Sequence, residues 1–289
     1  MKNFRFPPRS FFKTIPFYAL LFLSCSSLFY QPTQERYWNP DAFGFSYKEE
    51  DFHTIDGETL KLWRIGPKYD KPKGVVLQFH GNGENRTSHF ISLVWLVNQG
   101  YELVAFDYRG YLDSTGAAER EKIHEDSIAL IRKELEFSKL RNLPLIVYGQ
   151  SLGGAIAARA VSEIENKSGI LLLVLDGSFA SYRQVFRGVL KNVFFAPIDL
   201  IFAIFMDDDL SPGETLHKIS PVPILIVHGT ADPIVPYENG LELFRLAKDP
   251  KWFWEVRGGG HVDWMALGNS KESKNFLIFL DSLVRNFNP

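Results

Sequence analysis

The 289-residue chain has a single cysteine, Cys25, a formal net charge of only −2, and no apolar run long enough for a standard membrane-spanning helix. One cysteine excludes an internal disulfide framework and a cysteine-rich metal site. The small net charge, with no basic stripe in the body of the chain, gives no electrostatic basis for nucleic-acid binding. No internal repeat, low-complexity block or linker marks a second domain. With 45% hydrophobic and 23% charged residues, the sequence predicts a globular protein with one large domain.

The amino-terminal region has the layout of a secretory signal peptide. Basic residues occur up to Lys13, and an apolar run follows over residues 14–24. This run is short of the roughly 20 apolar residues that span a bilayer, so an uncleaved signal anchor is the less favoured alternative. Cys25 follows directly, and residues 22–25 (FLSC) resemble a bacterial lipobox, in which the cysteine is lipidated and becomes the mature amino terminus. An incidental cysteine is the other interpretation.

Lipidation would make the protein a membrane-anchored lipoprotein of the bacterial cell envelope. Residues 1–24 would then be a cleaved signal peptide, and residues 25–46 a tether between the membrane and the folded domain.

Short apolar runs alternate with amphipathic stretches of helix length through the rest of the chain. The predicted strands lie at residues 75–79, 103–106, 145–148, 170–175, 224–227 and 253–256, and the predicted helices include residues 88–98, 119–140, 152–163 and 238–247. Uniformly apolar strands that alternate with helices are typical of a parallel sheet with helices on both faces. The Asp56-Gly57 turn between residues 52–55 and 60–65 predicts an antiparallel hairpin ahead of that sheet.

Residues 179–220 break the alternation, because they contain apolar stretches but no strand pattern. They predict a small helical insertion over the sheet. Such helices would cover the sheet, shape an apolar substrate pocket, or do both.

A GQSLG motif at residues 149–153 lies between the strand of residues 145–148 and the Ala-rich stretch of residues 155–161. This strand–turn–helix setting is that of a nucleophile elbow, whose outer positions leave no room for a Cβ and are filled by glycine. A G-x-S-x-G motif alone often occurs by chance, so the interpretation depends on the strand before the motif and the helix after it. We expect Ser151 at the carboxyl end of its strand, where parallel sheets bind ligands.

A nucleophilic serine needs a base to take its proton and an acid to orient that base. His261 follows a glycine run at residues 258–260, and Asp232 lies in the loop after the strand of residues 224–227. The chain order serine, acid, histidine is that of the α/β-hydrolase triad. A loop aspartate is usually a turn former and a lone histidine is usually structural, but the three residues together predict a catalytic triad. His80 and His228, also at strand ends, are expected to be structural.

The chain resembles the α/β-hydrolase superfamily of serine hydrolases, in particular its monoacylglycerol-lipase-like and protein-depalmitoylase-like esterases. Besides the elbow, the motifs that carry the resemblance are HGNGEN at residues 80–85, FDYRGY at 106–111, LDGSF at 175–179, HGTAD at 228–232 and GH at 260–261. The resemblance implies an α/β-hydrolase fold for residues 47–289, with residues 179–220 as the helical insertion over the active site. It also implies that the backbone amides of Asn82 and Leu152 form the oxyanion hole.

The function predicted on this basis is cleavage of carboxylic ester or thioester bonds through an acyl-enzyme on Ser151, without a metal ion or an organic cofactor. The expected substrate is a small acyl ester, an acyl thioester or a lipid. Cleavage of an amide, peptide or carbon–carbon bond is an alternative, because the fold and triad do not choose the scissile bond. A further alternative is a non-catalytic envelope lipoprotein that binds an apolar ligand through residues 179–220.

Overall fold

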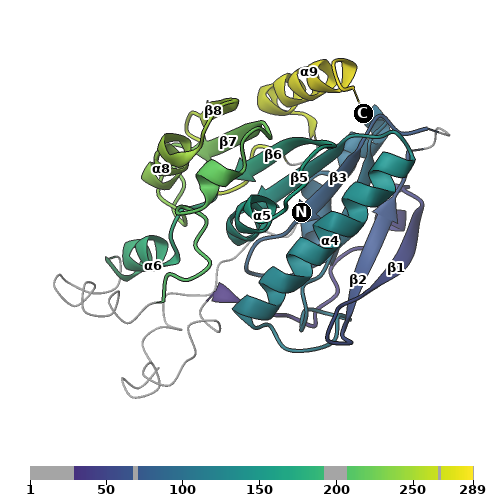
Figure 1. Cartoon of the computed structure of the whole chain (residues 1–289), viewed down its shortest axis with the longest axis horizontal. Helices are drawn as coiled ribbons and strands as arrows, with labels where there is room; N and C mark the ends of the chain where they lie inside the picture. The colour runs from purple at the N-terminus through teal and green to yellow at the C-terminus, as the bar shows by residue number, and fades with distance from the viewer. Residues whose placement is uncertain (1–28, 68–70, 192–206, 266–267, 289) are drawn as a thin grey trace.

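The computed structural model describes residues 29–67, 71–191, 207–265 and 268–288. They form an eight-stranded sheet in the order β1-β2-β4-β3-β5-β6-β7-β8 (Figure 1). The strands are β1 (Tyr47–His53), β2 (Thr59–Ile65), β3 (Val75–Phe79), β4 (Glu102–Phe106), β5 (Leu145–Gln150), β6 (Ile170–Asp176), β7 (Ile224–Gly229) and β8 (Lys251–Val256). The β1–β2 and β2–β4 pairs are antiparallel, and every pair from β4 to β8 is parallel. The predicted parallel sheet with an amino-terminal hairpin is confirmed.

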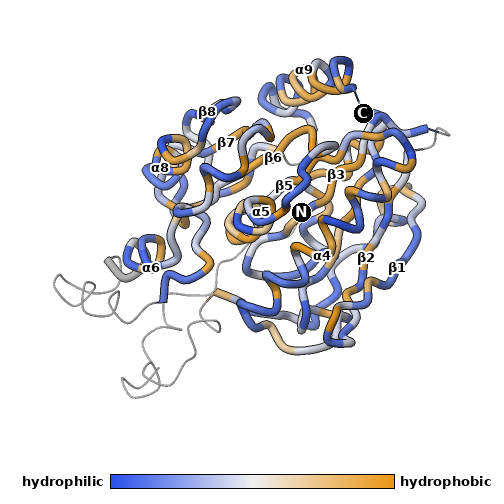
Figure 2. The backbone as a smooth tube through the Cα atoms, in the orientation of Figure 1, coloured by the Kyte–Doolittle hydropathy of each residue, from blue (hydrophilic) through white to orange (hydrophobic). Residues whose placement is uncertain are grey.

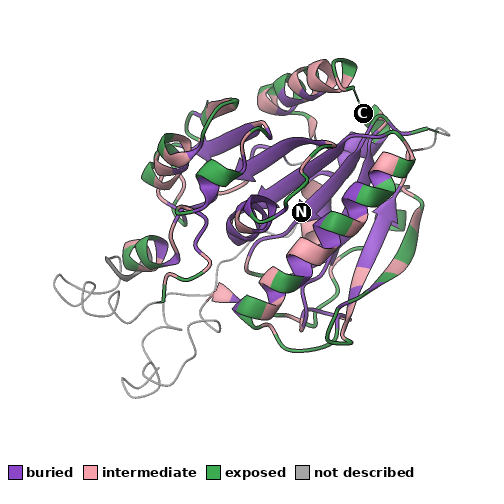
Figure 3. Ribbon diagram, viewed as in Figure 1, coloured by how far each residue is buried: buried purple, intermediate pink, exposed green. Residues whose placement is uncertain are grey.

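Two apolar cores lie on the two faces of this sheet. On one face, α4 (Arg120–Leu140), α5 (Leu152–Ser162) and α8 (Glu238–Leu246) contribute to the first core, and Figure 1 shows α4 and α5 in front of the sheet. On the other face, η4 (Val94–Gln99) and α9 (Lys271–Arg285) contribute to the second. Successive residues of a strand alternate between the two cores. All residues of β3 to β7 are therefore buried, and the middle of the sheet is apolar (Figures 2 and 3).

The segment between β3 and β4 differs from the continuous helix predicted at residues 88–98. It forms α3 (Arg86–His89), η3 (Phe90–Ser92) and then η4. Fully buried Phe90, Leu93 and Leu96 are three residues apart. A spacing of three matches the three residues per turn of a 3₁₀-helix, so these tighter turns bury all three side chains on one side.

The carboxyl-terminal helix α9 was absent from the sequence-based assignment. Its start carries a capping signal, since the Ser270 hydroxyl accepts a hydrogen bond from the Ser273 backbone amide at 2.9 Å. Phe276 and Leu280, four residues apart, are both fully buried. The cap and this spacing are the sequence signals that could have identified the helix.

In the predicted helical insertion, the structure describes α6 (Tyr182–Lys191) and the return through η5 (Leu216–Lys218). Residues 192–206 of that insertion lie outside the described residues, as do the predicted signal peptide and Cys25. In the parts of the chain that the structure describes, no helix combines the length and the apolar character needed to cross a bilayer.

The segment assigned above to a tether contacts the domain from the first described residue onward. Tyr30 is only 3% exposed. The Thr33 carbonyl accepts a hydrogen bond from the Leu112 amide at 3.2 Å, and the Trp38 amide donates one to the Thr87 carbonyl at 3.1 Å. A short 3₁₀-turn, η2 (Pro40–Phe43), then leads into β1. Residues 29–46 therefore run along the folded domain.

Candidate active site

Ser151 occupies a sharp turn between β5 and α5. Its backbone has φ 53° and ψ −121°, a conformation that is uncommon for a residue with a side chain. A Cβ at Gly149 would lie 2.4 Å from the Cα of Gly154, and one at Gly153 would lie 2.2 Å from the Phe79 carbonyl oxygen. The outer glycines of the motif are therefore required, because α5 begins directly against the end of β3. This packing leaves Ser151 partly exposed at the carboxyl end of the sheet.

Asp232 and His261 form a hydrogen-bonded pair. His261 Nδ1 donates to Asp232 Oδ2 at 2.7 Å, and the Asp232 carboxylate is fully buried. The other carboxylate oxygen accepts from the backbone amides of Ile234 and Val235 at 2.8 and 2.9 Å. Burial by itself raises the pKa of Asp232, but the hydrogen bonds from His261 and the two amides outweigh it and lower the pKa. A charged Asp232 holds the proton of His261 on Nδ1 and leaves Nε2 free to accept one.

Ser151 and His261 lie on either side of the end of β6. The Ser151 amide donates to the Asp176 carbonyl at 2.8 Å. A Cβ on the next residue, Gly177, would lie 3.4 Å from the His261 ring. The described residues include no hydrogen bond between the Ser151 hydroxyl and His261. A nucleophile and its general base often come within hydrogen-bond distance only when substrate binds.

The loop of residues 80–83 lies beside Ser151. A Cβ at Gly81 would be 3.6 Å from the Cβ of Ser151. Leu152 is the first residue of α5, so its amide has no acceptor within the helix. Neither the Leu152 amide nor the Asn82 amide donates a hydrogen bond to another described residue. Two free backbone donors next to a candidate nucleophile are what stabilisation of an oxyanion needs.

His80 and His228 are both buried and bonded to backbone carbonyls, as expected for structural residues. His80 Nδ1 donates to the Gly81 carbonyl at 2.8 Å, and His228 Nε2 donates to the Val235 carbonyl at 2.8 Å. Burial lowers the pKa of each ring, which favours the neutral form.

Sequence reasoning assigned no role to Asp176, the last residue of β6, although it lies in the LDGSF motif. Its buried carboxylate accepts hydrogen bonds from the Tyr148 hydroxyl at 2.9 Å and from Trp264 Nε1 at 2.8 Å. Burial raises the pKa of Asp176 to about 6, against the opposing effect of these two donors. Trp264 is three residues after His261, so Asp176 fixes the loop that carries the histidine. The signal for it was an acidic residue that ends an otherwise apolar strand.

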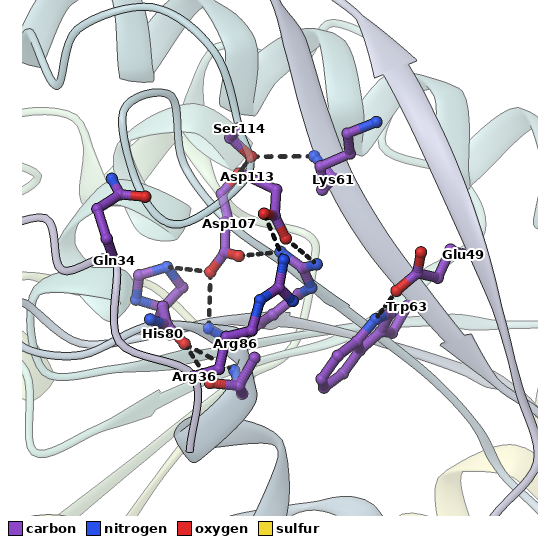
Figure 4. Close-up of polar contacts among 12 residues, drawn as sticks. Gln34, Arg36, Glu49, Lys61, Trp63, His80, Arg86, Asp107, Asp113 and Ser114 are labelled. Atoms are coloured by element: carbon purple, nitrogen blue, oxygen red, sulfur yellow. Dashed lines mark hydrogen bonds and ion pairs between the residues drawn. The ribbon is translucent and has the colours of Figure 1, made fainter. Parts of the chain in front are cut away.

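A second buried carboxylate supports the loop of residues 80–85 (Figure 4). Asp107, directly after β4, accepts a hydrogen bond from the Arg86 backbone amide at 2.6 Å and pairs with the Arg86 guanidinium. Burial raises the pKa of Asp107 to about 6, although the Arg86 charge opposes this. His80 Nε2 lies 3.7 Å from the same carboxylate. Asp107 thus ties the chain after β3 to the chain after β4.

The raised pKa of Asp176 predicts a pH-dependent stability. The folded state holds the proton of the Asp176 carboxyl group more tightly than the unfolded chain does. The resulting contribution of Asp176 to the free energy of unfolding is full below pH 3.8 and is lost as the pH rises through about 6. A pKa difference of that size corresponds to about 3 kcal/mol. Asp176→Asn stays neutral, its oxygen can accept from Trp264, and the Tyr148 hydroxyl can turn to accept from its NH₂. In urea titrations, the free energy of unfolding of this variant should rise relative to wild type between pH 4 and pH 7. Parallel pH profiles for the two proteins would contradict the assignment.

Comparison with known proteins agrees with this architecture. The family model described as serine aminopeptidase, S33, matches residues 70–195. The protein YfhR of Escherichia coli K12 is 28% identical over 241 residues, which cover 82% of this chain and 80% of YfhR. The rat lysophosphatidylserine lipase ABHD12 is 28% identical over 194 residues, or 63% of this chain and 48% of ABHD12.

Solved structures show the same fold. The Pyrococcus furiosus esterase Pf2001 superimposes with a TM-score of 0.69 at 19% identity, and the match covers 90% of this chain and 98% of the esterase. The esterase domain of a Rhodothermus marinus protein matches with a TM-score of 0.57 at 21% identity, over 84% of this chain and 99% of that domain. The sheet order and these solved structures show that the chain has the α/β-hydrolase fold.

Proposed function

We propose that the chain is a serine hydrolase that cleaves carboxylic ester or thioester bonds through an acyl-enzyme on Ser151. The observation that carries this proposal is the hydrogen bond between the covered Asp232 carboxylate and partly exposed His261, 2.7 Å between Oδ2 and Nδ1, at the same end of the sheet as the elbow serine. That pair leaves Nε2 of the imidazole ready to accept the serine proton. The names of the relatives, which include esterases and a lipase, also support action on esters.

The reaction proceeds in two halves. Ser151 Oγ attacks the acyl carbon while His261 Nε2 takes the hydroxyl proton, and the carbonyl oxygen becomes an oxyanion that receives hydrogen bonds from the amides of Asn82 and Leu152. The carbon–oxygen or carbon–sulfur bond then breaks, and His261 returns the proton to the departing alcohol or thiol. Water attacks the acyl-serine in the same way, and the acid leaves. Asp232 remains charged throughout and stabilises the imidazolium.

The surroundings of the site favour an apolar acyl group. Phe179 and Tyr182 follow β6 at the end of the sheet where Ser151 lies, and their rings pack with centroids 5.2 Å apart. The ring of Phe29 packs edge-on against Tyr182 with a centroid separation of 4.9 Å. Phe179 and Tyr182 are themselves almost fully buried, so they form an apolar wall beside the end of β6. A lipid or small acyl ester is therefore the proposed substrate class.

Labelling with a fluorophosphonate probe tests the nucleophile. Wild type should be labelled and should hydrolyse chromogenic esters or thioesters, whereas Ser151→Ala should lose labelling and at least about a thousandfold of its turnover. Parallel assays with aminoacyl anilides test amide cleavage as the alternative. The family model is described as a serine aminopeptidase, which favours that alternative. Faster turnover of the anilides would replace ester cleavage by that alternative. A folded wild-type protein that reacts with neither probe nor substrate would support the non-catalytic, ligand-binding alternative.

Asp232→Asn tests the acid. We expect turnover to fall by as much as about 10⁴-fold, because an amide in this position favours the wrong imidazole tautomer. Asp176→Asn is the comparison, since Asp176 is also a buried carboxylate at a strand end near the site, and it should retain turnover within about tenfold of wild type. The reverse ranking of the two variants would identify Asp176 as the acid. Circular dichroism of both variants controls for folding.

We further propose that a lipid on Cys25 holds the protein at a bacterial membrane, with an uncleaved anchor as the alternative. From Cys25 to the first described residue, Phe29, the chain reaches at most about 14 Å, so a lipid there would keep the candidate site near the bilayer. Mass spectrometry of protein purified from membranes should show the loss of residues 1–24 and an added lipid mass. Cys25→Ser should lack the lipid mass. An intact amino terminus would favour the uncleaved anchor.

A further inference from the structure

Residues 29–38, called the strap here, lie along the loop that contains Asn82. The Gln31 amide donates a hydrogen bond to Asn82 Oδ1 at 3.0 Å. Further along, the Asn85 side chain donates to the Glu35 carbonyl at 2.8 Å, and the Tyr37 amide donates to Thr87 Oγ1 at 3.1 Å. The strap therefore contacts the loop after β3 at successive positions from Asn82 to Thr87.

The strap is held at both ends by contacts that do not involve this loop. At its start, the Tyr30 hydroxyl is 3.3 Å from the Tyr182 hydroxyl, and Tyr30 is buried. Near its other end, Arg36 forms an ion pair with Asp113 at 2.5 Å, beside the Arg86–Asp107 pair (Figure 4). These contacts fix the Gln31 amide relative to the domain.

Asn82 depends on such outside support. Its neighbours Gly81 and Gly83 have no side chains to restrict the backbone, and a Cβ at Gly83 would meet no atom within 4 Å. The Asn82 carbonyl accepts a hydrogen bond from the Tyr111 hydroxyl at 3.0 Å, and its side-chain oxygen accepts the one from Gln31. One bond involves the side-chain oxygen of Asn82 and the other its backbone carbonyl, and the backbone N–H of Asn82 donates to no other described residue.

We propose that the backbone amide of Gln31 is a positioning group, which holds Asn82 so that its N–H points at the oxyanion formed on the substrate. This inference rests on the proposed function, because the oxyanion exists only in that reaction. An interaction that serves the oxyanion acts on the transition state more than on the bound substrate, so its loss lowers kcat and leaves KM nearly unchanged. The strap then belongs to the active site.

Gln31→Pro tests this, because proline removes the backbone N–H. Gln31→Ala keeps that N–H and is the matched control; the Gln31 side chain is exposed. We expect Gln31→Pro to lower kcat about tenfold, the effect of one lost hydrogen bond, with KM within about twofold, and Gln31→Ala to match wild type.

A double-mutant cycle shows whether Gln31 acts through Asn82. Asn82→Ala removes the acceptor and should lower kcat by a similar factor, and Gln31→Pro should have no further effect in that background. Additive losses, or equal kcat for the proline and alanine variants at Gln31, would overturn the inference while leaving the proposed function intact. If Gln31→Pro does not fold, wild-type kcat in Asn82→Ala overturns it equally. A wild-type protein that neither turns over nor labels with fluorophosphonate contradicts the proposed function itself.

Discussion

The close approach of α5 to the end of β3 is the constraint on which the rest of the site depends. At Gly153 a single added carbon would overlap the Phe79 carbonyl at 2.2 Å. This contact forces the turn that gives Ser151 its positive φ of 53°. It also brings the chain after β3 against that turn, so that Gly81 lies next to the serine. The candidate nucleophile and the candidate oxyanion loop are therefore neighbours because of backbone packing, before any side chain contributes.

Three carboxylates with covered side chains lie at or just beyond the carboxyl ends of the parallel strands, and their surroundings differ. Asp107 and Asp176 have pKa values raised to about 6 by burial. The side chain of Asp232 is also covered from solvent, yet its pKa is lowered, because it accepts hydrogen bonds from His261 and two backbone amides. At neutral pH, Asp232 thus has the strongest preference for the charged form among the three. An aspartate is therefore suited to orient a base at position 232, whereas the aspartates at positions 107 and 176 are suited to hold neighbouring loops in place.

The sequence allowed prediction of those parts of the fold and site that side-chain type and spacing specify. The apolar strands, the elbow glycines and the contact between Asp232 and His261 follow from pattern and from the rule that parallel strand ends converge. The hydrogen bond from Gln31 to Asn82 has no such signal, because its donor is a backbone amide that every residue except proline carries. The sequence also did not distinguish the 3₁₀-turns before β4 from an α-helix. Over so short a segment, apolar residues spaced by three and by 3.6 positions give nearly the same pattern.

The candidate oxyanion loop is stabilised by residues far apart in the chain. Gln31 and Tyr111 bond to Asn82 itself, and Arg86 is fixed by Asp107. Because Gly81 and Gly83 leave the loop no internal stiffness, its geometry depends on all of these partners being in place at once. The strap is the partner nearest in sequence to the proposed lipid anchor. Membrane attachment at Cys25 would then fix the start of the same segment that orients Asn82, so that anchoring and the geometry of the reaction site are physically linked.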